Sequence, residues 1–186
     1  GEDFGDITLT FALTHSVNTV YAEVGEKLGK GVMADYMARF GFGEDPPMDY
    51  PAGQMLPSGS YRKGKVISEK SRFVDVGRMA IGQDKLLVTP LQMATVAQTI
   101  ANGGVRMEPY LVSKAFDQDG RTTLDHEPQR AERAMSTRNA AALTASIDAC
   151  FDCGQSCTAC SDACLGEPDV QKQLRCITSC QNCADV

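Results

Sequence analysis

The chain has 186 residues, 42% hydrophobic and 23% charged, so it can bury a core as one domain or as two small ones. Its 24 acidic and 18 basic residues give a formal net charge of −6, without the basic excess that nucleic acid binding requires. No apolar run approaches the roughly 18 residues of a membrane span, and the acidic start is the reverse of a signal peptide's basic head. Because the chain lacks a basic excess, we expect no nucleic acid partner. The opening Gly1, in place of Met, favours a longer parent chain.

Two helices are predicted at the start of the chain. Apolar residues recur at three- and four-residue spacing over about 7–28, as an amphipathic helix requires. The Gly-Lys-Gly sequence at 29–31 breaks this helix, and a second helix is predicted over 32–40. The following run, 41–65, is rich in Gly and Pro and is predicted to be a long irregular loop.

The middle of the chain carries capping and turn signals. Thr89 and Pro90 occupy the N-cap and first helical positions of a predicted helix that ends at a Gly-Gly pair. Extended runs at 110–116 and 121–124 flank the turn sequence DQDG, which predicts a β-hairpin. Ser136 or the residue after it can cap a further helix, and no Gly or Pro interrupts that helix before the first cysteine.

All the cysteines lie within residues 150–183, five at spacings of 3, 4, 3 and 4 and then three at spacings of 4 and 3. These are heptad a/d intervals, so each group forms one stripe along a helix. A turn is predicted at 165–169 between the two helices. We therefore predict two antiparallel helices that face each other through their thiols. The eight candidate ligands are Cys150, Cys153, Cys157, Cys160, Cys164, Cys176, Cys180 and Cys183.

A cysteine-rich segment can form disulfides or bind one of several metals, and the helical spacing of the cysteines distinguishes between these possibilities. Cysteines along one helix face rarely have the geometry for disulfides. A structural zinc site takes four ligands from knuckles and turns, and an iron–sulfur cluster usually takes cysteines from loops. Cu(I) is soft, prefers thiolates and accepts two or three of them. We favour Cu(I), with zinc as the second choice. Free cysteines also pack well as small hydrophobic residues, but eight of them in the 34 positions of 150–183 make chance packing implausible.

The first three quarters of the chain contain ITLTFALTHSVNTVYAEVGEKLG, RFGFGEDP, AIGQDKLLVTPLQMATVAQTIANGGVRMEPYLV and FDQDG. In this order, over about residues 1–143, they resemble the transpeptidase domain of class B penicillin-binding proteins, which cross-link peptidoglycan. The block GQDKLLVTPLQMA is the most specific part. The resemblance implies a peptidoglycan stem peptide or a β-lactam as the ligand of the parent family.

That family uses three motifs, S-x-x-K, S-x-N and K-T-G, and Ser16-Val17-Asn18 matches the second. The resemblance implies that Ser16 shuttles a proton toward the leaving amine and that Asn18 hydrogen-bonds the acyl side chain of the substrate. A hydroxyl suits this role because it donates and accepts at once. His15, the residue before Ser16 on a predicted helix, points about 100° away from it and is expected to be structural, like His126.

The nucleophile motif is not found where the family has it. The sequence contains one S-x-x-K, Ser60 to Lys63, which follows S-x-N and lies in a predicted loop without the helical turn that would hold the base near its nucleophile. K-T-G is absent from the sequence. Loss of the nucleophile typically costs on the order of a millionfold in rate. We therefore expect this chain to be inactive in acyl transfer.

The last 42 residues have a second resemblance. The segment ASIDACFDCGQSCTACSDACLGEPDVQKQLRCITSCQNCADV, at about 145–186, repeats C-x-x-C-x-x-x-C around an LGE turn. It resembles the opening half of the Cys-rich four-helix-bundle copper storage proteins. The resemblance implies that the cysteines line a bundle core and bind Cu(I). Because only two of the four helices are present, either two Cys-rich hairpins pair between chains or the metal load is small and exposed.

Together these features predict an α+β chain with a partial transpeptidase domain over 1–143 and an all-α Cys-lined helical hairpin over 144–186. The expected function is a transpeptidase fragment fused to a Cu(I)-thiolate module. Two alternatives stay open: a copper-binding protein whose larger part is only scaffold, and an accidental chimera. The compartment is undecided, because the transpeptidase parent works outside the cytoplasmic membrane whereas free thiols favour a reducing space.

Overall fold

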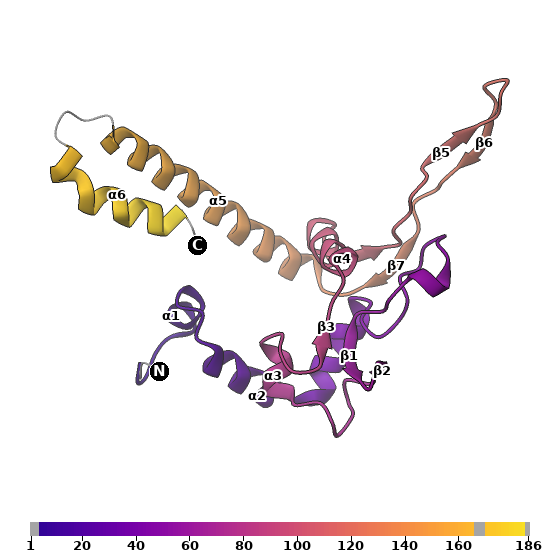
Figure 1. Ribbon diagram of the computed structural model, residues 1–186, viewed down its shortest axis with the longest axis horizontal. Helices are drawn as coiled ribbons and strands as arrows, with labels where there is room; N and C mark the ends of the chain where they lie inside the picture. The colour runs from indigo at the N-terminus through magenta and orange to yellow at the C-terminus, as the bar shows by residue number, and fades with distance from the viewer. Residues whose placement is uncertain (1–3, 166–169, 185–186) are drawn as a thin grey trace. The chain divides into compact units, whose positions relative to one another are not determined.

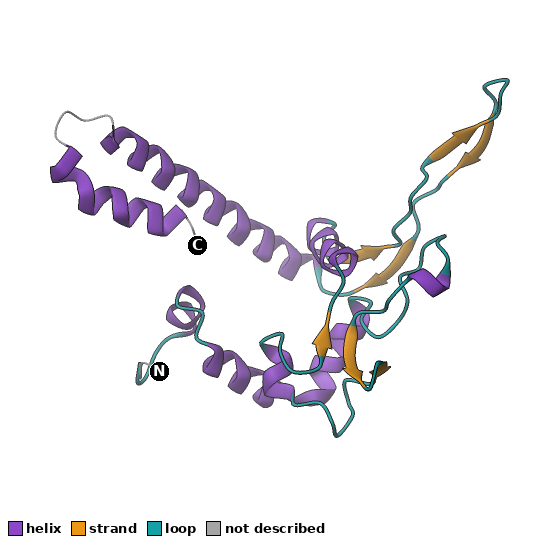
Figure 2. Ribbon diagram, in the orientation of Figure 1, coloured by secondary structure: helices purple, strands orange, loops and turns teal. Residues whose placement is uncertain are grey.

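The computed structural model describes residues 4–165 and 170–184, with only the backbone at 164, 170–172 and 181–184. It divides into two units, Gly1–Ala140 and Ala141–Val186 (Figure 1). The first unit combines helices with short antiparallel strands, whereas the second is helical where described (Figure 2). The predicted α+β class is confirmed.

The chain begins with two helices, α1 (Leu9–Thr14) and α2 (Asn18–Arg39). The prediction of one continuous helix over 7–28 is wrong at residues 15–17, where the backbone leaves the helical conformation and α2 begins afresh. Its predicted end is confirmed as a kink, because Gly29 has φ 80° and ψ 155° inside α2. The apolar spacing therefore identified the apolar face of the helices but not the break in the backbone at residues 15–17.

The short helix α3 (Val76–Ala80) packs closely on α2. Glycine makes this approach possible: a Cβ at Gly25 would collide with the side chain of Ala80. On the facing helix, a Cβ at Gly77 would lie 3.5 Å from the Cβ of Ala22. This seam of small residues anchors α2, the helix that carries Asn18 at its start.

A small antiparallel sheet has the strand order β2-β1-β3. Its strands are β1 (Gly59–Arg62), β2 (Lys65–Ile67) and β3 (Leu86–Leu87). The predicted loop over 41–65 is therefore wrong in its last third, and it also contains a 3-10 turn at Ala52–Gln54. Lys63 and Gly64 both have positive φ, 52° and 74°, as tight hairpin turns of the mirror-image types require.

Helix α4 (Pro90–Ala101) follows the predicted capping signal. The Thr89 hydroxyl accepts a hydrogen bond of 3.1 Å from the backbone N–H of Gln92. The buried Gln92 amide donates in turn to the carbonyl of Phe40, at 2.7 Å, and so ties α4 to the end of α2. The prediction of this helix and its cap is confirmed.

Two further strand pairs complete the first unit. They are β4 (Val105–Met107) with β7 (Arg130–Arg133), and β5 (Lys114–Phe116) with β6 (Thr122–Asp125). The second pair confirms the hairpin predicted from DQDG, although its strands are shorter than the predicted runs. The first pair was not predicted. Gly104 comes directly before β4 and has φ 86°. A Cβ added at this position would collide with the Met135 carbonyl.

Helix α5 (Thr137–Leu165) crosses the boundary between the units. The Ser136 hydroxyl accepts a hydrogen bond of 3.1 Å from the N–H of Asn139, so the predicted cap is confirmed. The helix continues without Gly or Pro up to the first cysteine, as the sequence indicated. Its next glycine, Gly154, lies well inside the helix.

Helix α6 (Val170–Ala184) folds back along α5 (Figure 1). Ser161 on α5 and Ile177 on α6 are the best buried side chains described in this unit, at 3% and 6% exposure. The predicted turn falls on residues 166–169, which lie outside the described residues. No helix in the described parts of either unit is long and apolar enough to cross a membrane.

Candidate functional site

Three thiols meet between α5 and α6. The sulfurs of Cys160, Cys176 and Cys180 all lie within 4.8 Å of one another. The Sγ atoms of Cys160 and Cys176 are 3.8 Å apart, far longer than the about 2.05 Å of a disulfide bond. Cys160 is exposed, and the two thiols of α6 are half-buried. Solvent ions therefore have access to the cluster through Cys160.

Local helix geometry explains the cluster. Cys176 and Cys180 are four residues apart, so they lie on one face of α6. Ser161 and Ile177, each next to a cluster cysteine in sequence, are buried where the helices pack. This packing holds Cys160 against the α6 pair.

One thiol of the cluster, Cys180, holds its proton tightly. The pKa of Cys180 is raised to about 12, first by its hydrogen bond with Cys160, then by burial, and then by its hydrogen bond with Cys176. At neutral pH the Cys180 thiol is therefore protonated. A metal that binds here must displace protons, as thiolate ligands require.

The spacing of the sulfurs fits one ion with three thiolates. With a metal–sulfur bond of about 2.3 Å, three sulfurs in a plane around one ion lie about 4.0 Å apart. The observed 3.8 Å pair and the 4.8 Å limit are within a small side-chain adjustment of that value. Among the side chains that the structure describes, no fourth cysteine, histidine or carboxylate joins this group.

The other cysteines of the stripe lie outside the cluster or outside the described side chains. Cys150 and Cys153 are exposed, and Cys157 is half-buried. The side chains of Cys164 and Cys183 are not among those described. Of the six predicted ligands whose side chains are described, the structure thus brings three together. Sequence spacing placed each stripe, but it carried no signal for the offset between the helices, which selects the three.

The S-x-N motif lies at the junction of α1 and α2. Ser16 is exposed and has φ 50°, a left-handed conformation that is uncommon outside glycine. The backbone N–H of Val17 donates to the carbonyl of Ala12, at 2.8 Å, and closes the turn. Asn18 is the first residue of α2 and is also exposed. The tight turn presents the Ser16 hydroxyl to solvent at a cost in backbone strain.

Both histidines are engaged with neighbouring rings. The His15 ring stacks on Phe11 with centroids 3.8 Å apart, and its Nδ1 lies 3.0 Å from the carbonyl oxygen of the same residue. His126 stacks on Tyr110 with centroids 4.1 Å apart. These contacts agree with the structural roles expected for them.

The lone S-x-x-K sequence lies on a strand and its turn. Ser60 is 1% exposed, and its backbone N–H donates to the buried carboxylate of Glu69, at 3.3 Å. Lys63 is in the hairpin turn that follows β1. The pair therefore lacks the helical turn that would hold a lysine beside its serine.

The sequence also matches two known families. Residues 2–149 match the family model of the penicillin binding protein transpeptidase domain. The chain belongs to this family. Residues 139–186 match the copper storage protein family. The two resemblances seen in the sequence are confirmed, and the matches overlap within α5.

The curated relatives of this chain are much longer than it is. Peptidoglycan D,D-transpeptidase PbpA of Mycolicibacterium smegmatis is 33% identical over 138 residues, which cover 74% of this chain and 26% of the relative. Penicillin-binding protein 1A of Neisseria gonorrhoeae is 31% identical over 144 residues, which cover 75% of this chain and 14% of the relative. The chain thus spans about a quarter or less of these proteins.

Solved structures agree on the fold of the transpeptidase part. Penicillin-binding protein A from M. tuberculosis, in an imipenem acyl-enzyme complex, has a TM-score of 0.63 and 31% identity, covering 77% of this chain and 31% of that one. The D,D-transpeptidase domain of a peptidoglycan glycosyltransferase from Eggerthella lenta has a TM-score of 0.59 and 25% identity, covering 75% and 35%. The mycobacterial protein thus reacts with a β-lactam.

Proposed function

We propose that the second unit binds Cu(I) through Cys160, Cys176 and Cys180. The carrying observation is the group of three sulfurs within 4.8 Å of one another. The match of residues 139–186 to the copper storage protein family supports the metal. In this site the ion is cargo, and the thiols are its ligands.

The ligand set favours Cu(I) over zinc. Thiolates are soft ligands that select Cu(I), and three of them satisfy its coordination. Structural zinc almost always takes four ligands, and the described side chains supply three at this point. Access through the exposed Cys160 allows the ion to arrive by exchange from another thiol ligand.

Anaerobic titration with Cu(I) against a competing chelator tests this proposal. Cys176→Ser should lower the affinity of the tightest site by about a hundredfold or more, because it leaves two thiolates where the ion needs three. Cys150→Ser is the matched control, since Cys150 is an exposed cysteine of the α5 stripe that lies outside the cluster. Equal losses in both variants, or no Cu(I) bound by the unaltered chain, would contradict the proposal.

For the first unit we propose that Ser16 and Asn18 are the counterparts of the family's S-x-N motif. The exposure of both residues and the left-handed backbone of Ser16 support this assignment. The ligand class would be a peptidoglycan stem peptide or a β-lactam. We also propose that the 186-residue chain does not itself form an acyl-enzyme, since its one S-x-x-K serine, Ser60, is buried on a strand.

Labelling with a fluorescent penicillin tests the proposed inactivity. The expected result is no covalent label on the chain under conditions that label a full-length penicillin-binding protein stoichiometrically. Peptide mapping would identify any serine that reacts. Stoichiometric labelling of any serine in the chain would overturn the proposal, and labelling of Ser60 would also overturn its assignment as a structural residue.

A further inference from the structure

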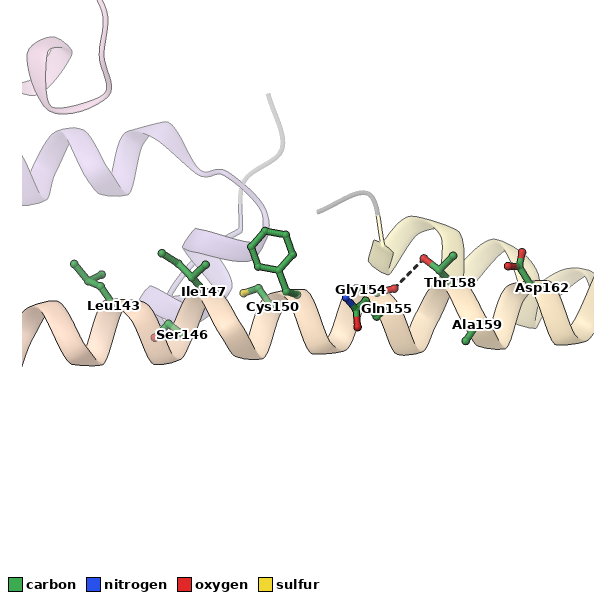
Figure 3. Close-up of a pocket in the computed structure, with 10 residues that line it drawn as sticks. Leu143, Ser146, Ile147, Cys150, Gly154, Gln155, Thr158, Ala159 and Asp162 are labelled. Atoms are coloured by element: carbon green, nitrogen blue, oxygen red, sulfur yellow. Dashed lines mark hydrogen bonds between the residues drawn. The ribbon is translucent and has the colours of Figure 1, made fainter. Parts of the chain in front are cut away.

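Helix α5 carries an exposed apolar stripe in addition to its thiols. Leu143, Ile147 and Phe151 leave 42%, 46% and 67% of their surface exposed. They line one hollow together with smaller side chains further along the same helix (Figure 3). At Gly154 and Thr158 the stripe becomes shallow, and the Thr158 hydroxyl is turned back to donate to the Gly154 carbonyl, at 2.9 Å.

This stripe is separate from the metal cluster. At about 100° per residue, Ile147 and Gly154 lie about 140° and about 120° around the helix from Cys160, the α5 cysteine of the cluster. By the rise of about 1.5 Å per residue, the 29 residues of α5 extend about twice as far as the 15 of α6. Helix α6 therefore leaves the first half of α5 without a partner in the hairpin, and that half carries the three large apolar residues.

We propose that a second copy of this chain covers the stripe, with the two α5 helices antiparallel about a two-fold axis between Cys150 and Phe151. In this register, Ile147 of each copy enters the space above Gly154 of the other. On one side of the axis the two Phe151 rings meet, and on the other side the two Cys150 thiols meet. Large residues thus face small ones when the stripe is reversed onto itself, as a two-fold interface requires.

Charge and area agree with this partner. From residue 143 to the end of α5 the charged residues are Asp148, Asp152 and Asp162, and Asp162 lines the far end of the hollow. By helix geometry Asp148 and Asp152 lie roughly 90° or more from the centre of the stripe, so they stay in water. In the proposed register Asp162 faces Asn139 of the other copy, beyond the last large apolar residue, so it lies at the polar rim. Six large side chains, each hiding on the order of 100 Å², contribute roughly 600 Å², and the small residues between them bring the total near the about 1,000 Å² of a specific interface. The dimer is therefore expected to be weak and in the micromolar range.

Sedimentation of the full chain, reduced and with a metal chelator, tests the proposal over a micromolar range of concentration. We expect a reversible dimer without metal. Phe151→Ala and Gly154→Leu should each raise its dissociation constant about tenfold or more. Gly154→Leu is informative because it improves helix propensity while it fills the space that Ile147 enters. Phe116→Ala, at a residue 59% exposed on β5, is the matched control and should change nothing.

Cross-linking checks the register. A short bis-maleimide should join Cys150 to Cys150 in the dimer band, as found by peptide mapping, and Cys150→Ser should abolish that product. A chain that stays monomeric at all concentrations would overturn the proposal. So would a dimer that is unaffected by both stripe variants, or one in which Cys150 is joined only to cysteines of its own chain. None of these results depends on the copper proposal.

Discussion

The two units of the chain obtain their geometry in different ways. In the first unit, critical contacts join residues far apart in sequence: the Lys30 ammonium donates to the carbonyl of Val74, at 2.6 Å, and Arg106 pairs with Glu44, at 2.9 Å. In the second unit, the cysteines take their places from helical periodicity, and one helix contact completes the site. Substitutions that destabilise the fold of the first unit should therefore leave the metal cluster intact.

The largest expected effect comes from Gly104→Ala in the first unit. Gly104 has φ 86°, and a Cβ there would collide with the Met135 carbonyl, whereas Gly120 has φ 77° and open space around it. Left-handed strain alone costs roughly 1–2 kcal/mol, and the collision should bring the loss for Gly104→Ala to about 3 kcal/mol. Urea unfolding measures both variants, with Gly120→Ala as the strain-only control.

The same samples test the independence of the units. Cu(I) affinity should be unchanged in Gly104→Ala, because none of the three cluster cysteines lies in the first unit. A parallel loss of copper binding would show that the hairpin depends on the transpeptidase unit, and the contrast between the units would fail.

Metal loading should act in the opposite sense. Cu(I) at a hundred times its dissociation constant stabilises the site it binds by about 2.7 kcal/mol. Hydrogen exchange should therefore slow about a hundredfold around Cys160 and Cys176, while amides of α2 keep their rates. Removal of the metal with a chelator should restore the original rates. Equal protection in both units would contradict this expectation.

A smaller effect is expected from Glu44→Gln. The Arg106 side chain is only 8% exposed, so loss of its partner leaves a buried charge without compensation, although Glu44 itself is 57% exposed. We expect a loss of about 1–2 kcal/mol in the free energy of unfolding. The exposed pair of Lys114 and Asp125, also 2.9 Å long, is the control, and Lys114→Gln should cost less than about 1 kcal/mol. Equal costs would remove the distinction between buried and exposed pairs.

The smallest effect is expected from Asp35→Asn. The hydrogen bond and charge of Lys70, at 2.8 Å, lower the pKa of Asp35 below its ordinary value of 3.8. A lowered pKa gives stability that is present above pH 3.8 and is lost as the pH falls through the folded-state value. The variant should therefore be slightly less stable than the unaltered chain at neutral pH and equal to it in acid. Thermal unfolding across this range checks the sign.

Sequence patterns predicted the features that depend on neighbouring residues. The cap at Thr89, the turn in DQDG and the cysteine stripes all follow from spacing within one turn or one helix. The break at 15–17 was missed because the apolar spacing continues across it. The β1–β2 hairpin was missed because a Gly- and Pro-rich composition obscured its short strands.

The candidate sites show the same limit. Six of the predicted ligands have described side chains, but only Cys160, Cys176 and Cys180 meet, because the offset between α5 and α6 depends on the connection and on packing. Motif matching found Ser16, but nothing in the sequence indicated its backbone conformation. Long-range contacts and backbone strain are thus the features of the candidate sites that residue spacing does not predict.

At Ser16 the backbone conformation favours glycine, whereas the S-x-N motif requires a hydroxyl. A residue at φ 50° would be relaxed by glycine, which adopts that conformation without a steric penalty. Ser16→Gly should therefore leave the first unit as stable or more stable, as long as the lost strain outweighs the added freedom of the unfolded chain. A gain on that substitution would mean that the fold tolerates serine here for the sake of its hydroxyl, and would separate what the turn needs from what the motif supplies.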